Sequence, residues 1–225
     1  WAEFRQKIYD YYGGPAAVRT GWVSMTCFEP HVGAAAFREM VDAEPRITLF
    51  HGFWPVEVFM DAGRVTGAAL VNEAGERIEV RARVTVDATE YGDVMARAGV
   101  EYRIGQESAA QTGEPGVPPT ATDIIQDLTL VAILKDYGEG ADVTIPEPPG
   151  YDPALFAGCC GDGAAHTCDH MMDYGKLPNG KYMINWPTHG NDYYADLIEL
   201  SHEERRKHFI KARSMTQGWV QPRCR

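Results

Sequence analysis

The residues whose types and spacing best suit chemistry form a turn, residues 87–93 (DATEYGD). The turn follows a β-branched segment, residues 83–88, that we predict to be a buried parallel strand, and it precedes a predicted helix at residues 94–98. A strand that turns sharply into a helix leaves backbone N–H groups free where the helix begins, and such groups bind phosphate. Gly92 allows close approach to the backbone, and Asp93 is a candidate N-cap. The turn therefore predicts a cofactor site, with an ordinary capped strand-to-helix turn as the alternative.

A second group of polar and aromatic side chains occupies residues 185–194 (NWPTHGNDYY). An imidazole such as that of His189 can donate or accept a proton near neutral pH. Asn185, Asn191 and Asp192 could hydrogen-bond a polar substrate that stacks against the neighbouring rings. The alternative is a loop whose Asn and Asp side chains satisfy their own backbone.

A third candidate is a group of thiols and imidazoles, formed by Cys160, His166, Cys168 and His170. These are residue types that bind zinc, but no Cys-x-x-Cys pair is present and so local a site is atypical. We therefore predict a glycine-rich loop with incidental thiols and no metal. The chain has five cysteines, an odd number in a long chain, which favours a reducing, cytoplasmic compartment over a disulfide scaffold.

The elements that must position the first turn follow from hydrophobic periodicity. We predict helices at 4–12 and 32–43, a strand at 47–50, a three-stranded antiparallel meander at 53–82, the strand at 83–88 and the helix at 94–98. This order predicts a doubly wound α/β domain that an antiparallel excursion interrupts.

The second half of the chain has a looser pattern. Residues 106–122 and 138–165 are rich in Gly and Pro and predict loops, whereas residues 127–136 are apolar enough for a core strand. Ser201 and Glu204 have the spacing of a capping box at the start of a final helix. We expect an α+β region here.

Composition excludes several classes of function. The chain has 225 residues, of which 44% are hydrophobic, and a net charge of −11, so it is an ordered, acidic protein. No long basic patch is present, which argues against a nucleic-acid binder. No apolar stretch is long enough for a membrane span, and the sequence identifies no oligomeric state.

The stretch VTVDATEYGDVMARAGVEYRIGQES resembles the signature of FAD-dependent oxidoreductases with a glutathione-reductase-type fold. More narrowly, it is similar to the bacterial FAD-dependent oxidoreductase family related to the fumarate-reductase flavoproteins, as are FEPHVGAAAFREMV and INWPTHGNDYY. The resemblance implies FAD as cofactor. It further implies that the backbone of Val56 meets the adenine, that Asp87, Ala88 and Thr89 line the adenosine and pyrophosphate, and that Gly92 and Asp93 form the turn beside them.

One motif of that family is missing from this sequence. The family's pyrophosphate is held by a Gly-x-Gly-x-x-Gly turn, and no such pattern occurs between Trp1 and Arg225. We therefore expect an internal fragment of a flavoprotein that retains FAD poorly. Residues 1–105 would be a partial FAD-binding domain and residues 106–225 a partial substrate-side region.

The resemblance implies an enzyme that transfers a hydride between a small polar organic substrate and flavin, with His189 as the candidate base. Two alternatives remain open on the residues alone. The aromatic, amide and carboxylate side chains of the second half also suit a carbohydrate-active enzyme or lyase. The missing phosphate turn also suits a non-catalytic binding fragment.

Overall fold

The computed structural model describes residues 1–161, 163–186 and 188–221, and each structural statement below concerns these residues. The chain divides into two compact units. Unit 1 contains Trp1–Ile47, Gln126–Ala195 and Ser201–Arg225, and unit 2 contains Thr48–Ile125 and Asp196–Leu200. The two ranges that we predicted as domains, 1–105 and 106–225, each contribute to both units. Segments that are distant in the sequence therefore build each unit.

Unit 2 is built on the antiparallel meander that the sequence predicted. β1 (Phe53–Asp61), β2 (Arg64–Asn72) and β3 (Arg77–Arg81) form a three-stranded sheet in that order, with antiparallel neighbours. In the turn between β1 and β2, Ala62 and Gly63 have positive φ angles of 47° and 78°. Two such residues give a hairpin turn whose twist matches that of the strands. The predicted meander over residues 53–82 is confirmed.

A β-bulge interrupts β1 at Val56. The register pairs Pro55 with Leu70 and Glu57 with Ala69, which leaves Val56 without a partner on β2. Bulges release one residue from the ladder and are frequent at sheet edges and beside binding sites. β1 is an edge strand of its sheet. The backbone of Val56 is therefore placed at an edge, outside the regular ladder.

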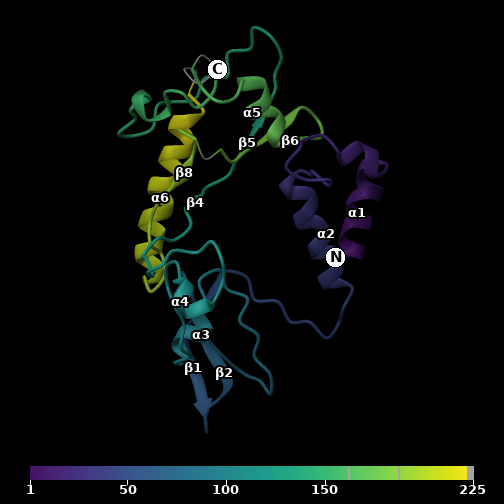
Figure 1. Cartoon of the computed structure of the whole chain (residues 1–225). Coiled ribbons are helices and arrows are strands. Elements are labelled where there is room, and N and C mark those ends of the chain that lie inside the picture. Colours follow the sequence, from purple (N-terminus) through teal and green to yellow (C-terminus); the bar gives the residue numbers. More distant parts are fainter. Residues whose placement is uncertain (162, 187, 222–225) are drawn as a thin grey trace. The chain divides into compact units, whose positions relative to one another are not determined.

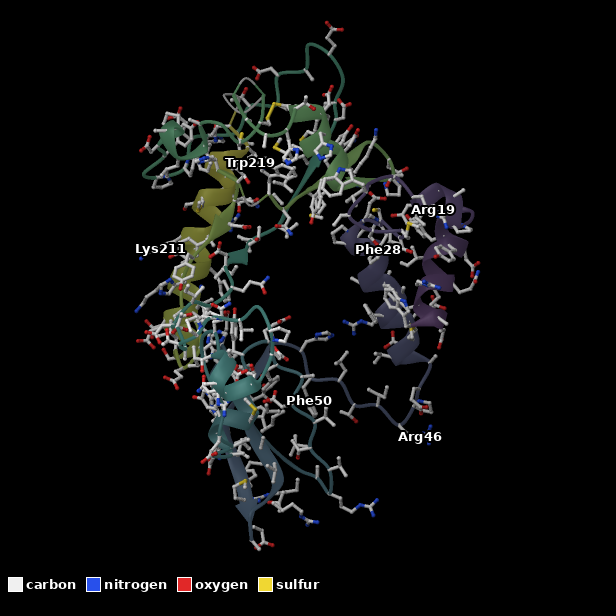
Figure 2. All side chains as sticks on the ribbon, viewed as in Figure 1. Arg19, Phe28, Arg46, Phe50, Lys211 and Trp219 are labelled. Atoms are coloured by element: carbon white, nitrogen blue, oxygen red, sulfur yellow. A yellow bond between two sulfur atoms is a disulfide. The ribbon has the colours of Figure 1, made fainter. Side chains whose placement is uncertain are left out.

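Two predicted strands, residues 47–50 and 83–88, are not formed. A buried parallel strand needs hydrogen-bonded neighbours, and no described strand pairs with either segment. The side chains of Val84 and Val86 are 77% and 80% exposed, and Phe50, labelled in Figure 2, is also exposed. All ladders between described strands are antiparallel. The structure thus confirms a mixed α/β protein with small antiparallel sheets.

Two short helices complete unit 2, α3 (Asp93–Arg97) and α4 (Ala109–Thr112). α3 confirms the helix predicted at residues 94–98, shifted by one residue. α4 corrects the prediction that residues 106–122 are entirely loop. Ser108 and Gln111 form a capping box there, and such reciprocal bonds stabilise even a single helical turn.

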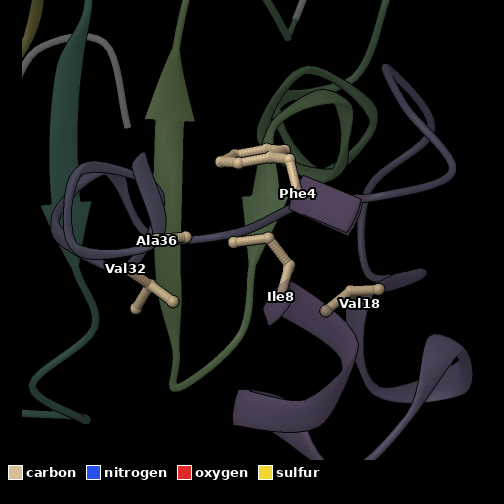
Figure 3. Packing of buried hydrophobic residues seen from close by; sticks show 5 residues of the cluster. All are labelled: Phe4, Ile8, Val18, Val32 and Ala36. Carbon is tan, nitrogen blue, oxygen red and sulfur yellow. The ribbon is translucent and has the colours of Figure 1, made fainter. Parts of the chain in front are cut away.

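The first part of unit 1 is a pair of helices around a small apolar core. α1 (Ala2–Tyr12) and α2 (Pro30–Asp42) lie side by side, and the short 3₁₀ helix η1 (Pro15–Val18) follows α1 (Figure 1). The buried core residues are Phe4, Ile8, Val18, Val32 and Ala36 (Figure 3). Both predicted helices are confirmed. α2 begins earlier than predicted because proline, here Pro30, fits the first helical position, where its missing N–H costs nothing.

The second part of unit 1 combines small sheets with helices. β5 (Ala132–Lys135), β7 (Lys181–Ile184) and β6 (Lys176–Leu177) form one antiparallel sheet, and β4 (Leu128–Thr129) pairs with β8 (Asp192–Tyr193). The strand predicted at residues 127–136 is therefore two strands in separate sheets. The 3₁₀ helix η2 (Pro153–Phe156) and α5 (Cys168–Tyr174) lie between β5 and β6 in the sequence.

The long helix α6 (His202–Trp219) begins at the predicted capping box of Ser201 and Glu204, which is confirmed. Its end packs into the second core of unit 1, and Trp219, labelled in Figure 2, is 2% exposed. The buried members of this core are Phe156, Met171, Ile184, Trp186 and Trp219. Among the described helices, none is both long and apolar enough to cross a membrane.

Candidate functional site

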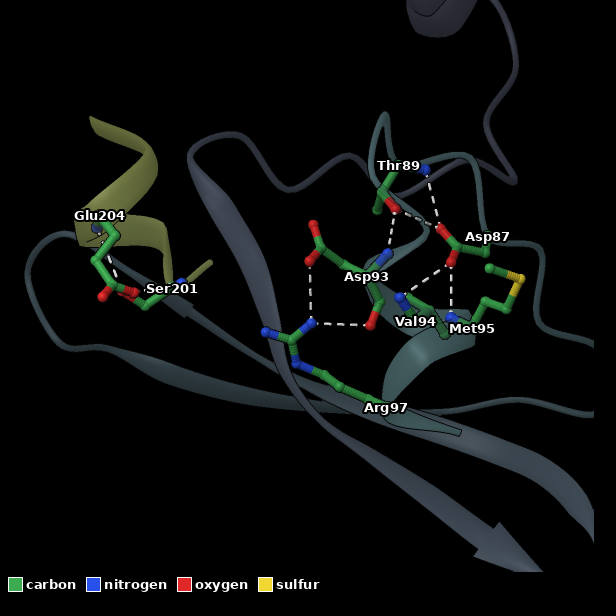
Figure 4. A network of polar contacts seen from close by, with 8 residues as sticks. All are labelled: Asp87, Thr89, Asp93, Val94, Met95, Arg97, Ser201 and Glu204. Atoms are coloured by element: carbon green, nitrogen blue, oxygen red, sulfur yellow. Dashed lines mark hydrogen bonds and ion pairs between the residues drawn. The ribbon is translucent and has the colours of Figure 1, made fainter. Parts of the chain in front are cut away.

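The carboxylate of Asp87 occupies the N-terminus of α3 (Figure 4). Its Oδ2 accepts hydrogen bonds from the backbone N–H groups of Val94 at 3.0 Å and Met95 at 2.8 Å. Its Oδ1 accepts from the backbone N–H of Thr89 at 2.9 Å and from the Thr89 hydroxyl at 2.7 Å. The Thr89 hydroxyl oxygen in turn accepts from the N–H of Asp93 at 2.8 Å. The N–H groups that sequence reasoning left open for a phosphate are thus satisfied within the protein.

The N-cap of α3 is Gly92, which corrects our assignment of Asp93 to that position. Gly92 has a φ of 64°, in the left-handed region that glycine adopts without strain. Asp93 is the first helical residue, and its carboxylate pairs with Arg97 at 3.1 Å. The capping function belongs to Asp87, whose side chain reaches the helix from outside it.

These bonds set the charge state of Asp87. Burial by itself would raise the pKa of the carboxyl group. The hydrogen bonds from Thr89, Met95 and Val94 outweigh burial and hold the pKa of Asp87 below its usual value. A carboxylate offers about four acceptor positions, and Asp87 uses its two oxygens for four bonds. The protein itself therefore uses the hydrogen-bonding capacity of this group.

In unit 2, the remaining predicted cofactor residues are Val56, at the bulge of β1, and Ala88, within the turn. Both residues are exposed.

The predicted substrate residues of unit 1 separate into two kinds. Asn185 and Asp192 both line a cavity of about 510 Å³. Asn191, by contrast, is 0% exposed. Its amide oxygen accepts from the N–H of Trp186 at 2.9 Å, and its amide nitrogen donates to the carbonyl of Ile184 at 3.2 Å. Asn191 therefore holds the loop together and does not line the cavity.

His189 is exposed and does not line this cavity. Its φ is 48°, so the backbone here is in the left-handed region. The next residue, Gly190, has no room for a side chain, because a Cβ would lie 1.7 Å from the carbonyl oxygen of Trp186. The chain therefore makes a tight turn at His189 and Gly190. Pro187, in the same predicted segment, lies outside the described residues.

Aromatic rings form one side of the cavity. Trp22 and Tyr174 meet edge to face with ring centres 4.6 Å apart, and Tyr174 meets Trp186 in the same manner at 6.0 Å. The ring of His166 meets Trp186 at 5.5 Å. Gly21 lets the backbone beside Trp22 approach this group closely, because a Cβ there would lie 2.7 Å from the carbonyl oxygen of Tyr174.

Polar side chains form the remainder of the cavity lining, namely Gln126, Asp127, Thr129, Asn185, Thr188 and Asp192. The Thr129 hydroxyl donates to Asp192. Within the described part of the chain, the side chains of Gln126, Asp127 and Asn185 make no hydrogen bond. The cavity is therefore lined by donors and acceptors that the protein does not use.

Sequence reasoning missed Trp22, Gln126 and Asp127 as parts of this site. Trp22 is more than 140 residues from Asn185 in the sequence, and no motif connects the two. His166 was singled out only as a potential zinc ligand. No spacing signal could have found this set, because its members meet only through the packing of the first 47 residues on residues 126–195.

The thiols near His166 are joined to each other. Cys160 and Cys168 form a disulfide, which closes a loop that carries His166. Our preference for a reducing compartment did not anticipate this bond. Cys27 and Cys159 are free and buried, and Cys224 lies outside the described residues. In the described chain, no group of three or more His, Cys, Asp or Glu side chains could hold a metal ion.

A buried acid, Glu29, was also missed. Its side chain is 4% exposed and pairs with the ammonium of Lys181. The Tyr12 hydroxyl donates to it at 2.9 Å and the Asn179 amide at 2.7 Å. Burial opposes the ionisation of Glu29, but the hydrogen bonds from Lys181, Asn179 and Tyr12 outweigh it and lower the pKa of Glu29. Burial and the neighbouring carboxylate of Glu29 raise the pKa of Tyr12 to about 12. This cluster connects the α1–α2 pair to β7, and both carboxylate oxygens of Glu29 accept hydrogen bonds within the protein.

The family model described as FAD dependent oxidoreductase matches residues 1–222. No curated protein and no solved structure matches the chain significantly. The family match covers both units, including the turn at residues 87–93 and every described residue that lines the cavity. The chain belongs to the FAD-dependent oxidoreductase family, whose cofactor is FAD.

Proposed function

We propose that the protein transfers a hydride between a small polar organic substrate and flavin, and that the cavity of unit 1 lined by Trp22, Asn185 and Asp192 binds the substrate. The observation that carries the proposal is the lining of this cavity, in which Gln126, Asp127 and Asn185 have no partner among the described residues. Asn185 is half-buried, and a half-buried amide normally finds a partner, so an unused amide that lies beside aromatic rings on a cavity indicates a ligand. Gln126 and Asp127 are exposed at the same cavity, where they are hydrated and open to a ligand.

The residues of unit 2 fit one part of FAD and not another. The bulge at Val56 and the exposed backbone at Ala88 suit the adenosine end. The start of α3 does not suit the pyrophosphate, because Asp87 occupies its N–H groups and a carboxylate repels phosphate. We propose that Val56 and Ala88 contact adenosine and that Asp87 and Thr89 hold the turn in shape.

Bound FAD supplies the redox chemistry, since its flavin ring accepts or returns the hydride. The protein must orient the substrate and remove a proton when a hydroxyl group is oxidised. His166 lines the cavity, whereas His189 does not. We therefore propose His166 as the proton acceptor and keep His189, the candidate from the sequence, as the rival that the experiment must separate from it.

The test is anaerobic reduction of flavin by candidate substrates. The chain is mixed with FAD, unbound flavin is removed, and the visible flavin absorbance is followed after each polar substrate is added. We expect bleaching with at least one hydroxyl-bearing compound. His166→Gln should slow it by about 10²–10⁴-fold, the usual contribution of a general base. His31→Gln, at an exposed position on α2, is the matched control.

Loss of bleaching in His189→Gln with normal rates in His166→Gln would assign the proton to His189 instead. A chain that never retains FAD would contradict the proposal. It would then be a non-catalytic binding fragment, which the occupied N-terminus of α3 favours as the second candidate. Flavin-independent cleavage of a polysaccharide would identify a carbohydrate-active enzyme or lyase.

A further inference from the structure

We infer that the cavity of unit 1 binds a neutral, polyhydroxylated ring, such as a monosaccharide or a cyclitol. The inference rests on the proposed function, in which this cavity holds the substrate, and it names the chemical class of that substrate. Three properties of the lining lead to it: the absence of a cation, the type of the unused polar groups, and the aromatic side of the cavity.

The charge of the lining disfavours an anion. Asp127 and Asp192 line the cavity, and no Lys or Arg is among the described residues that do so. An anionic ligand would lose its hydration and meet like charges without a compensating partner, which costs free energy. A sugar acid or a phosphorylated compound is therefore a poor ligand for this cavity.

The unused polar groups match hydroxyl groups. A hydroxyl both donates and accepts, a carboxylate only accepts, and a side-chain amide does both. Asp127 can thus accept from one hydroxyl, while Gln126 and Asn185 can each donate to one and accept from another. A ligand with several adjacent hydroxyl groups satisfies all of these positions at once.

The aromatic side matches the apolar face of a ring. Trp22, Tyr174 and Trp186 lie on the same cavity, with neighbouring rings 4.6 Å and 6.0 Å apart. Saturated rings that carry hydroxyl groups at their edges leave C–H groups on their faces, which pack on aromatic side chains. The cavity volume, about 510 Å³, lies within the range of small-molecule sites.

An organic cation is the main rival, because aromatic rings and carboxylates together also bind amines. Two observations favour the neutral ring. Asp192 already accepts from the Thr129 hydroxyl, so one of its acceptor positions is used. Gln126, Asn185 and Thr188 are neutral hydrogen-bonding groups, which an ammonium group would leave largely unpaired.

The test measures binding without flavin. Because Trp22 and Trp186 line the cavity, their fluorescence reports on a ligand there. The full chain is titrated with glucose and myo-inositol as neutral rings, with glucuronate as the anion and with cyclohexylamine as an amine that carries no hydroxyl group. We expect saturable quenching by a neutral ring, and binding of glucuronate and cyclohexylamine at least about tenfold weaker, which corresponds to about 1.4 kcal/mol.

Two variants locate the binding. Trp22→Ala should weaken binding of the neutral ring by about three- to tenfold. Trp1→Ala is the control and should leave binding unchanged, because the indole of Trp1 is 74% exposed and does not line the cavity. Asp127→Asn should strengthen binding of glucuronate by about three- to tenfold, since one repelling charge is gone. If Trp22→Ala does not fold, saturation-transfer NMR on the unmodified chain reports the same contact through the C–H groups of the ligand.

Preferential binding of cyclohexylamine or glucuronate, or no binding of either neutral ring, would overturn the inference. These results are separable from the proposed function because no flavin is needed. Flavin reduction by a compound that is insensitive to Trp22→Ala would leave the oxidoreductase intact and overturn only the cavity assignment. Binding of a neutral ring by a chain that never retains FAD would support the cavity assignment and overturn the oxidoreductase proposal.

Discussion

Asp87 in unit 2 and Asp127 in unit 1 are carboxylates in opposite circumstances. Asp87 accepts four hydrogen bonds from its own turn and helix, whereas Asp127 lines a cavity and accepts none from the described residues. The sequence draws attention to the first, because it stands in a motif, and not to the second. A carboxylate in a conspicuous motif can thus serve the fold, whereas an exposed carboxylate outside any motif keeps its acceptor positions open to water or to a ligand.

The largest effect should come from Glu29, the buried and fully paired carboxylate of unit 1. Glu29→Gln leaves the half-buried ammonium of Lys181 without its counter-charge, so we expect a loss of about 3 kcal/mol in the free energy of unfolding, the lower end of the range for breaking a buried pair. Urea denaturation measures it. Glu39→Gln breaks an exposed pair with Lys7 and should cost at most about 1 kcal/mol. Equal losses in the two variants would show that Glu29 does not connect the α1–α2 pair to β7.

Asp87→Ala should destabilise unit 2 by about 2–4 kcal/mol, because it removes a charged cap and leaves the N–H groups of Val94 and Met95 without their acceptor. Hydrogen exchange at these two amides measures the effect locally. Glu90→Gln, at an exposed carboxylate in the same turn, is the control and should leave their protection unchanged. Unchanged protection in Asp87→Ala would contradict the assignment of a structural role.

Acidification should produce a smaller loss at the same site. The folded pKa of Asp87 lies below that of the unfolded chain, so the stabilisation is complete above the ordinary carboxyl pKa and disappears as the pH falls through the folded value. The protonated group keeps its volume and some of its bonds, which makes the loss smaller than in Asp87→Ala. Exchange of the Val94 and Met95 amides, followed from neutral to acidic pH, should show this decline. Asp87→Ala should not share it.

Asp127→Asn should change the free energy of unfolding by less than about 0.5 kcal/mol, because none of the described residues depends on this carboxylate for a hydrogen bond. Thermal and urea unfolding of the variant and the unmodified chain check this. A loss comparable to that of Asp87→Ala would abolish the contrast between the two regions and assign Asp127 to the fold.

Local features of the fold were predictable because their signals are local. Alternating side chains and short polar turns specify the meander at residues 53–82, and the Ser201–Glu204 spacing specifies the start of α6. The strands predicted at 47–50 and 83–88 failed because a parallel strand depends on neighbours that periodicity does not reveal. The division of residues 127–136 into β4 and β5 depends on partners some 50–60 residues later.

Residue types and their spacing were enough to identify the family, its FAD cofactor, the helices α1, α2 and α6, the meander, and two residues of the cavity, Asn185 and Asp192. Packing of the folded chain established that Asp87 caps α3, that Asn191 is buried, and that Trp22 and Asp127 join Asn185 around one cavity. The physical reason is that hydrogen-bond saturation and cavity lining depend on which groups meet in space. Residue type and spacing specify only what each group is able to do.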